Sequence, residues 1–319
     1  MRYALMTEPQ QGLSYAEVLA LARTAEEAGF EAFFRSDHYA SFPGESGLTT
    51  TDAWATLAGI ARETSTIRLG TLVSPVTFRL PGNLAKVIQT VDDMADGRIE
   101  AGFGAGWNAA EHAQLGLPFP SLGERYDMLE EQMTIIHGLW TEPDGWSFEG
   151  RHWQVQESRR HGEVARGERR HPHIIFGGEG HRRLASLVAR FGDEFNLMSA
   201  GPEMVPAAYG RIREACRSAG RDPDELVYSA MTGVLVADTE EDLRARVADL
   251  LAVLGKADAD GKAWLAERRG RWVMGTPDEA HERARALGNV GVQRIMLQDF
   301  LPRDLDHVRL MGRIFAGGS

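Results

Sequence analysis

The segment SYAEVLALARTAEEAGFEAFFRSDHY, residues 14–39, joins a helix directly to a buried strand. Ser14 and Glu17 have the spacing of an N-terminal capping box, and Gly29 marks the end of the helix. The following run, residues 31–35, is apolar without alternation, as expected for a strand that is buried on both faces. A capped helix next to such a strand is the repeating unit of a parallel β/α fold.

The same unit recurs along the chain of 319 residues. Amphipathic helices with capping signals begin at Ser121 and at Thr276-Pro277, and short β-favouring runs alternate with the helical stretches. The predicted strands are residues 3–7, 31–35, 67–73, 99–103, 173–176, 195–198, 227–236 and 292–297. Eight strands that alternate with helices predict an α/β fold, a closed (β/α)8 TIM barrel, with an open doubly wound sheet as the alternative.

Two segments interrupt this alternation, and we interpret them as insertions into a single domain that spans residues 1–319. Residues 141–172 contain a predicted hairpin around Glu149-Gly150, followed by a run of charged residues. Residues 238–273 are helical in character. Both segments are expected over one face of the barrel, where lids and substrate pockets form.

Charge and composition limit the possible partners and compartments. The chain has 46 acidic and 35 basic side chains and a net charge of −11, which disfavours nucleic acid and anionic lipid as partners. No stretch approaches the roughly 18 consecutive apolar residues of a membrane span, and the start of the chain lacks the pattern of a signal peptide. The single cysteine, Cys216, fits a reducing compartment, so we expect a cytoplasmic protein.

Polar residues at strand ends are candidates for chemistry, because barrel enzymes act where strands end and βα loops begin. Asp37 and His38 follow the second strand, and a carboxylate beside an imidazole can orient a ring or bind a ligand. Capping and loop hydrogen bonds are the alternative interpretation. Arg35 is interpreted as an ion pair at the edge of the core, and Arg79 as part of a rigid connection after the third strand.

Glycines follow the fourth strand. Gly102, Gly104 and Gly106 allow close approach of the backbone to a flat or phosphorylated ligand. Gly104, Gly106 and Ala109 also match the fingerprint of a dinucleotide site. We reject that match, because no strand ending in an acidic residue follows about 20 residues later.

A second group of glycines follows the fifth strand. Gly177, Gly178 and Gly180 lie where the strand gives way to a helix, and Arg182 and Arg183 fall in the first helical turn. Free backbone N–H groups and arginines at a helix N-terminus can bind a phosphate. A tight structural turn is the alternative.

Two other classes of site are disfavoured. His171 and His173 form the only close histidine pair, and they precede their strand instead of ending it, so no metal site is predicted. No G-x-S-x-G nucleophile motif is present.

Taken in order, these motifs resemble those of the bacterial luciferase-like flavin and deazaflavin oxidoreductases, in particular the branch that depends on coenzyme F420. The resemblance runs from the first strand to the last helix, and the block that starts DGRIEAGFGAGWNAAEH at Asp96 is its most specific part. The other matching blocks are residues 27–39, 67–79, 174–196 and 275–297.

The resemblance implies a (β/α)8 barrel with insertions, usually a homodimer, that holds an isoalloxazine or deazaflavin ring at its C-terminal mouth. It places His38 beside the ring as the catalytic residue, with Asp37 before it. It also implies a non-proline cis peptide at Leu72-Val73 behind the ring, with Ser74 next. The residues implied near the ring, its ribityl chain and its phosphate are Gly106, Trp107, Asn108, Gly177, Gly178, Glu179 and Gly180.

The function implied is hydride transfer between F420 and a small organic substrate. An FMN-dependent monooxygenase on the same barrel, and a non-catalytic flavin- or deazaflavin-binding protein, are the alternatives. Sugar-phosphate dehydrogenases of this superfamily carry a glutamate acid where Trp107 stands here. That difference argues against a sugar-phosphate substrate. It leaves the proton donor unassigned, because Glu111 lies further along the chain.

Overall fold

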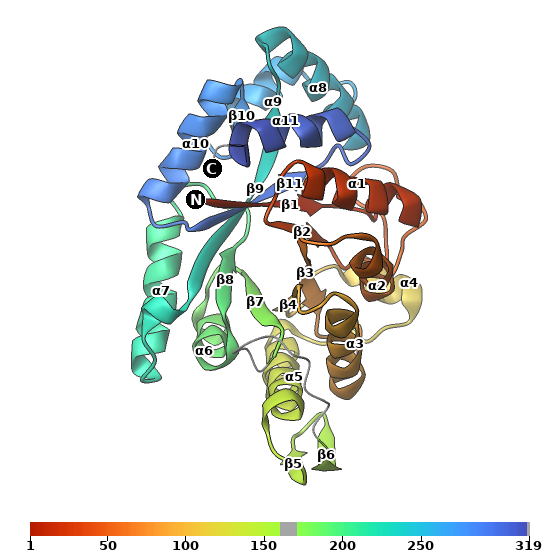
Figure 1. Ribbon diagram of the computed structural model, residues 1–319, viewed down its shortest axis with the longest axis vertical. Coiled ribbons are helices and arrows are strands. Elements are labelled where there is room, and N and C mark those ends of the chain that lie inside the picture. Colours follow the sequence, from red (N-terminus) through yellow and green to blue (C-terminus); the bar gives the residue numbers. More distant parts are fainter. Residues whose placement is uncertain (160–170, 318–319) are drawn as a thin grey trace.

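A parallel barrel forms the centre of the computed structural model, which describes residues 1–159 and 171–317 (Figure 1). The barrel strands are β1 (Arg2–Thr7), β2 (Ala32–Arg35), β3 (Arg68–Pro75), β4 (Ile99–Gly104), β7 (His173–Gly178), β8 (Glu194–Leu197), β9 (Val227–Val236) and β11 (Arg294–Asp299). They pair in this order around the barrel, and β9 pairs with both β8 and β11, which closes it. The predicted (β/α)8 barrel is confirmed, and the open doubly wound sheet is wrong.

Helices surround the barrel, and the predicted capping signals begin three of them. The helices are α1 (Tyr15–Glu27), α2 (Ala53–Glu63), α3 (Pro81–Met94), α4 (Ala109–Leu115), α5 (Leu122–Thr141), α6 (Arg182–Phe191), α7 (Val205–Ser218), α8 (Glu240–Val253), α9 (Gly261–Arg268), α10 (Pro277–Asn289) and α11 (Leu305–Phe315), with a short 3₁₀ turn at Pro223–Glu225. Ser14 and Thr276 form reciprocal capping boxes, and Ser121 caps α5. Among the helices of the described ranges, none is long and apolar enough to cross a membrane.

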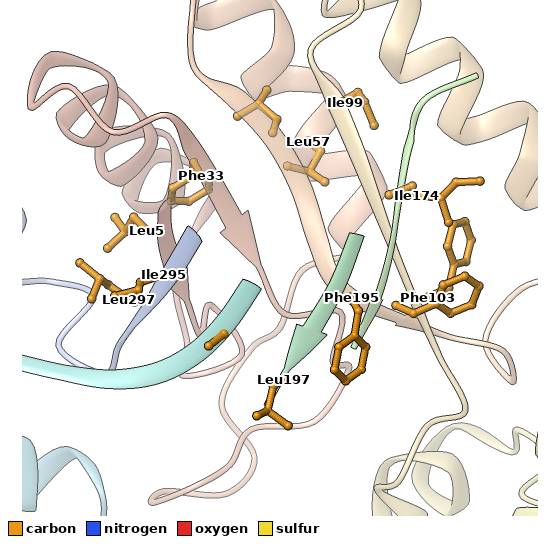
Figure 2. Close-up of a cluster of buried hydrophobic side chains, with 14 of the residues drawn as sticks. Leu5, Phe33, Leu57, Ile99, Phe103, Ile174, Phe195, Leu197, Ile295 and Leu297 are labelled. Atoms are coloured by element: carbon orange, nitrogen blue, oxygen red, sulfur yellow. The ribbon is translucent and has the colours of Figure 1, made fainter. Parts of the chain in front are cut away.

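Strand residues alternate between two apolar layers, which explains why their sequences are unbroken runs of apolar residues. Leu5 and Phe33 point outward against the helices, whereas the next residues, Met6 and Phe34, point into the barrel. Figure 2 shows part of the outer layer, with side chains from several strands and Leu57 of α2. Both faces of each strand are therefore buried, as in other parallel sheets.

A buried ion network lies inside the barrel at the N-terminal ends of its strands. Arg294 Nη1 lies 2.6 Å from Glu100 Oε2 and 3.1 Å from Glu194 Oε2. His173 Nε2 lies 3.1 Å from the same Glu194 oxygen. Glu100, His173 and Glu194 are close enough together to share a cation, but the Arg294 guanidinium already binds both carboxylates. The network therefore fills the base of the barrel with paired charges.

This network predicts a pH-dependent stability. Burial alone would lower the pKa of His173, but its hydrogen bond to Glu194 and the charges of Glu100 and Asp193 outweigh burial and raise that pKa. A raised pKa stabilises the fold fully below about pH 6.5, the pKa of a free imidazole, and the stabilisation is lost as the pH rises through the folded-state value. Calorimetry should show Tm falling with pH above that point, and falling less in His173→Gln.

The control for this experiment is His281→Gln, which removes an exposed histidine outside the buried network and shows what the loss of any one histidine does to Tm. A slope in His173→Gln equal to that of the wild type would show that His173 does not carry the effect.

The two predicted insertions lie in different places. Residues 141–172 include the predicted hairpin, formed by β5 (Trp146–Glu149) and β6 (Gln154–Ser158), which lies against the outer side of α5 (Figure 1). The Glu131 carboxylate of α5 accepts hydrogen bonds from three backbone N–H groups at the hairpin tip, residues 151–153. The described part of this segment therefore covers the flank of the barrel and not its mouth, contrary to our expectation. Most of the charged run falls at residues 160–170, outside the described ranges.

Residues 238–273 follow the C-terminal end of β9. They supply α8, α9 and the first residue of β10 (Val273–Gly275), a short strand beside the end of β9 that the sequence did not reveal. A second apolar cluster holds the insertion together, with Leu243, Val247 and Leu250 of α8 packed near Trp264 of α9. Its last residues reach the mouth of the barrel.

Candidate active site

A cavity of 690 Å³ opens at the C-terminal ends of the barrel strands. Its floor is apolar and contains Met6, Leu72, Met198 and Met231, which continue the inner layer of the barrel. Around this floor stand Glu8, Ser36, His38, Phe42, Pro43, Trp107, Ser199, Thr232, Gly233, Glu267, Arg268, Arg271, Trp272, Gln298 and Phe300. Of the site residues predicted from the sequence, His38, Leu72 and Trp107 line this cavity.

Glu111 fixes the imidazole ring of His38. His38 Nδ1 lies 3.0 Å and 3.1 Å from the two carboxylate oxygens of Glu111, and the Tyr39 backbone N–H donates to one of them at 3.1 Å. The Glu111 side chain is 1% exposed. The carboxylate oxygens of Glu111 are hydrogen-bond acceptors, so Nδ1 is placed to donate to them and Nε2 is the ring nitrogen left for a ligand. This is the arrangement of an imidazole that exchanges protons.

Aromatic rings hold His38 from two further sides. The centroids of Phe42 and Trp107 lie 4.5 Å and 5.7 Å from that of His38, and both rings meet it edge to face. Trp107 is 63% exposed, so it forms part of the rim of the cavity. Together with Glu111, these rings leave the His38 imidazole one orientation, with its side chain 16% exposed.

The predicted cis peptide at Leu72-Val73 is confirmed. The pairing of β3 with β4 shifts register between Thr71 and Ser74, so the peptide lies in a bulge beside the cavity floor. A Cβ at Gly104 would lie 2.6 Å from Val73 Cγ2, and one at Gly177 would lie 2.9 Å from Val73 Cγ1. The bulge therefore explains these glycines, whereas the sequence suggested that they admit a ligand.

Asp37 supports this bulge and does not line the cavity. It is 1% exposed, and Ser74 Oγ donates to its Oδ2 at 2.8 Å while accepting from Trp54 Nε1 at 2.9 Å. Arg79 donates to both Asp37 oxygens, at 2.5 Å and 3.1 Å. Asp37 and Ser74 therefore stabilise the bulge, and neither side chain contacts the cavity.

Arg79 ties this network together, although its sequence context suggested only a rigid connection. It also donates to Asp52 Oδ2 at 2.5 Å and to the Tyr39 hydroxyl at 2.7 Å. Burial would lower the pKa of Arg79, but Asp37 and Asp52 outweigh burial and raise it, so the guanidinium stays charged. Arg35 is fully buried, donates to backbone carbonyls and makes no ion pair within the described ranges, so the expected ion pair is wrong. It does not line the cavity, as expected.

The loop after β4 has a fixed shape. Gly106 has φ 76°, which favours glycine, and the Asn108 side chain caps α4 by accepting from the Ala110 N–H at 3.1 Å. His112 Nδ1 donates to the Asn108 carbonyl at 2.7 Å, and its Nε2 lies 2.6 Å from Thr77 Oγ1. Gly106 and Asn108 therefore shape the loop that presents Trp107 to the cavity.

The loop after β7 begins α6 at the same end of the barrel. Gly180 has φ 69°, and Arg211 donates to its carbonyl and to that of Glu179, at 2.9 Å and 2.7 Å. The Glu179 carboxylate pairs with His181 at 2.9 Å, and both side chains are largely exposed. A Cβ at Gly178 would lie 2.7 Å from Leu184. These residues shape a turn beside the cavity and do not line it.

The two arginines of this helix start differ. Arg183 donates to the Gly123 carbonyl at 2.7 Å and pairs with Asp127, so it is committed to α5. Arg182 is exposed and makes no ion pair within the described ranges. Arg182 is thus the arginine available to an anion at the start of α6.

The Glu8 carboxylate lines the cavity, and the sequence analysis did not identify it. Glu8, just after β1, is 5% exposed and accepts from Gln298 Nε2 at 2.5 Å and from Gln10 Nε2 at 2.8 Å. Gln10 in turn accepts from Ser36 Oγ at 2.6 Å. This chain of hydrogen bonds lies across the barrel mouth.

Comparisons with known proteins agree with this geometry. The family described as "Luciferase-like monooxygenase" matches residues 1–296. The chain is 28% identical over 306 residues to an F420-dependent glucose-6-phosphate dehydrogenase of Nakamurella multipartita, covering 88% of this chain and 86% of the relative.

Solved structures show the same fold. The monooxygenase RslO1 from Streptomyces bottropensis superposes with a TM-score of 0.82 at 24% identity, over 99% of this chain and 98% of the other. An F420-dependent secondary alcohol dehydrogenase, solved with an F420-acetone adduct, gives a TM-score of 0.80 at 19% identity, over 98% of both chains.

Proposed function

The chain belongs to the luciferase-like monooxygenase family, and on that premise we propose that it transfers a hydride between the deazaflavin coenzyme F420 and a small organic substrate. The observation that carries this proposal is the Glu111-His38 pair at the wall of the cavity, with Nδ1 3.0 Å from the carboxylate. The F420-dependent dehydrogenase among the relatives supports the choice of cofactor. We place no sugar phosphate in the site, because Trp107 and not an acid follows Gly106.

The residues present fit a flat tricyclic cofactor. A cavity of 690 Å³ is within the usual range of about 300–1,000 Å³ for small-molecule sites. Its apolar floor would face a planar ring, with Leu72 and Val73 of the bulge behind the ring. Gly178, at the end of β7, and Arg182, at the start of α6, would receive the phosphate. Glu179 would contribute only its backbone, because its carboxylate would repel an anion.

The chain's own groups supply what hydride transfer requires besides the carrier. When bound, the deazaflavin provides the hydride carrier and, unlike a flavin, does not activate oxygen. His38 would hold or accept a proton at Nε2 as charge develops on the substrate. Glu111 would keep the other proton on Nδ1 and stabilise a positive imidazolium. The methionines of the floor would exclude water from the reacting atoms.

We also propose the setting in which this function operates. The protein would act as one domain, residues 1–319, with the segments 141–172 and 238–273 as insertions, and as a homodimer in the cytoplasm. Its partner would be a small molecule, without nucleic acid or membrane. The net charge of −11 supports the absence of nucleic acid and anionic membranes as partners, and the single, unpaired Cys216 supports a reducing compartment.

A second candidate is an FMN-dependent monooxygenase, favoured by the structural likeness to a monooxygenase. A non-catalytic flavin- or deazaflavin-binding protein is the third.

Anaerobic mixing of the protein with reduced F420 and a panel of carbonyl and alkene acceptors separates the proposed function from both alternatives. We expect the visible absorbance of oxidised F420 to return with at least one acceptor. If the reduced cofactor binds and no acceptor oxidises it, the non-catalytic alternative stands.

Replacement of Arg182 by Ala should weaken F420 binding about tenfold, because a charge-assisted contact to the cofactor phosphate is lost. Fluorescence titration of the deazaflavin measures the Kd. Arg183→Ala is the matched control, since its guanidinium is held by Asp127 and Gly123. Equal losses in the two variants, or no loss in either, would remove Arg182 from the phosphate site.

A further inference from the structure

One wall of the cavity is built by the insertion and differs from the rest. It consists of Glu267, Arg268, Arg271 and Trp272 from the end of the insertion, together with Gly233 of β9 and Phe300 after β11. The cofactor-related residues His38, Leu72 and Trp107 come instead from β2, β3 and β4 or the loops that follow them. The insertion wall is therefore the part of the cavity that is available to contact a substrate.

The insertion wall carries a rigid aromatic shelf. The rings of Trp272 and Phe300 are stacked, with centroids 5.6 Å apart and planes 17° apart, and Trp264 meets Trp272 edge to face at 5.3 Å. A Cβ at Gly233 would lie 2.3 Å from the Trp272 ring, so the indole lies directly on the β9 backbone. Trp272 and Phe300 both line the cavity, so this pair offers an apolar aromatic surface to a ligand.

Within the described ranges, each charged side chain that lines the cavity has an ionic or hydrogen-bonding partner, except Arg271. Glu267 pairs with Arg268 at 2.8 Å, and the Arg268 guanidinium also lies 4.4 Å from the centre of the Trp264 ring. Glu8 accepts from two amide side chains, as described above. Arg271 is different, since within the described ranges its guanidinium has no ion pair or hydrogen bond.

The backbone of Arg271 is held in place although its guanidinium is not. Its carbonyl accepts from the buried Thr232 Oγ1 at 3.0 Å, and its N–H donates to the Arg268 carbonyl at 2.9 Å. A tethered arginine beside an aromatic shelf places a positive charge next to a planar surface. That combination matches a ligand with an aromatic body and an acidic substituent.

We propose that the substrate of this enzyme is a planar aromatic or conjugated carboxylate, whose anion pairs with Arg271 while its body lies on Trp272 and Phe300. This proposal rests on the function proposed above. A carboxylate matches the planar guanidinium in shape, because both of its oxygens can accept from the fork of N–H groups. Binding at Arg271 also leaves His38 Nε2, on the opposite wall, available for proton transfer.

The test uses the full-length protein with and without saturating F420, and two isosteric probes, 2-naphthoate and 2-naphthamide. Isothermal calorimetry should show that the wild type prefers the anion about tenfold over the neutral amide. Arg271→Gln should abolish the preference, and Arg271→Lys should retain part of it. The control variant is Arg244→Gln, which removes an exposed arginine of α8 outside the cavity and should leave the preference unchanged.

Several results would overturn the assignment. They are equal affinity for both probes, no binding of either probe, tighter binding of the cationic 2-naphthylmethylamine, or the same loss in Arg244→Gln as in Arg271→Gln. Binding of F420, measured separately, shows whether a failed prediction concerns the substrate class or the cofactor. If F420 binds and the anion is not preferred, only the substrate class is wrong. If the anion is preferred and F420 does not bind, the cofactor is wrong.

Discussion

Replacement of His38 by Ala lowers the rate of hydride transfer by about 10²–10⁴-fold, the usual contribution of a positioned acid or base. His38 is the cavity residue whose ring Glu111 holds through Nδ1, so its loss would remove the proposed proton-exchanging group and leave the apolar floor in place. The Kd for F420 should rise less than the rate falls. Stopped-flow absorbance of the deazaflavin gives the rate, and fluorescence titration gives the Kd.

The control for His38 is His281→Ala, which removes an exposed histidine of α10 that is hydrogen-bonded to the Ile314 carbonyl and does not line the cavity. Its rate should match the wild type. If His38→Ala also transfers hydride at the wild-type rate, proton exchange at this position is not part of the reaction.

Replacement of Glu111 by Gln is expected to lower kcat by about 10²-fold, with KM changing much less. The amide has the size of the carboxylate, and its oxygen can still accept from the Tyr39 N–H. It lacks the negative charge that stabilises an imidazolium, and its NH₂ group can donate to Nδ1 and select the wrong tautomer. Steady-state kinetics with the acceptor found above separates kcat from KM.

The double variant His38→Ala/Glu111→Gln shows whether Glu111 acts through His38. If it does, the double variant is no slower than His38→Ala alone, because the second change has nothing left to orient. Losses that multiply would instead assign Glu111 an independent role, such as support of the loop at Tyr39. Circular dichroism melting of each variant checks that the barrel remains folded.

The fold was predictable because its determinants are local. A helix cap is encoded within four residues, as at Ser14 and Glu17, and a strand buried on both faces is visible as an unbroken apolar run. The hairpin around Glu149 was also predictable. Its position was not, because it depends on the carboxylate of Glu131 on α5, a contact between segments that the sequence does not connect.

The site was only partly predictable, because its important contacts join residues that lie far apart in the sequence. His38 was visible as a polar residue at a strand end, but its partner Glu111 is 73 positions away. Glu111 looked misplaced because position along a loop does not show where α4 directs a side chain. Gly104 and Gly177 were visible as glycines at strand ends, but the sequence could not show that Val73 lies close enough to require a glycine at both positions.

The supporting layer around the site could not be separated from the site itself. Asp37 precedes His38 in the chain, yet it points away from the cavity to Arg79 and Ser74. Adjacent residues of an extended chain point in opposite directions, so one of the two had to face the interior. Which one did so depends on the positions of Arg79 and Glu111, which other strands set.

Parallel titrations of the cofactor-free full-length protein with F420 and with FMN determine whether this barrel holds a deazaflavin. We expect F420 to bind with a Kd on the order of micromolar, and FMN at least about tenfold more weakly. Tight binding of FMN with no binding of F420 would contradict a deazaflavin site.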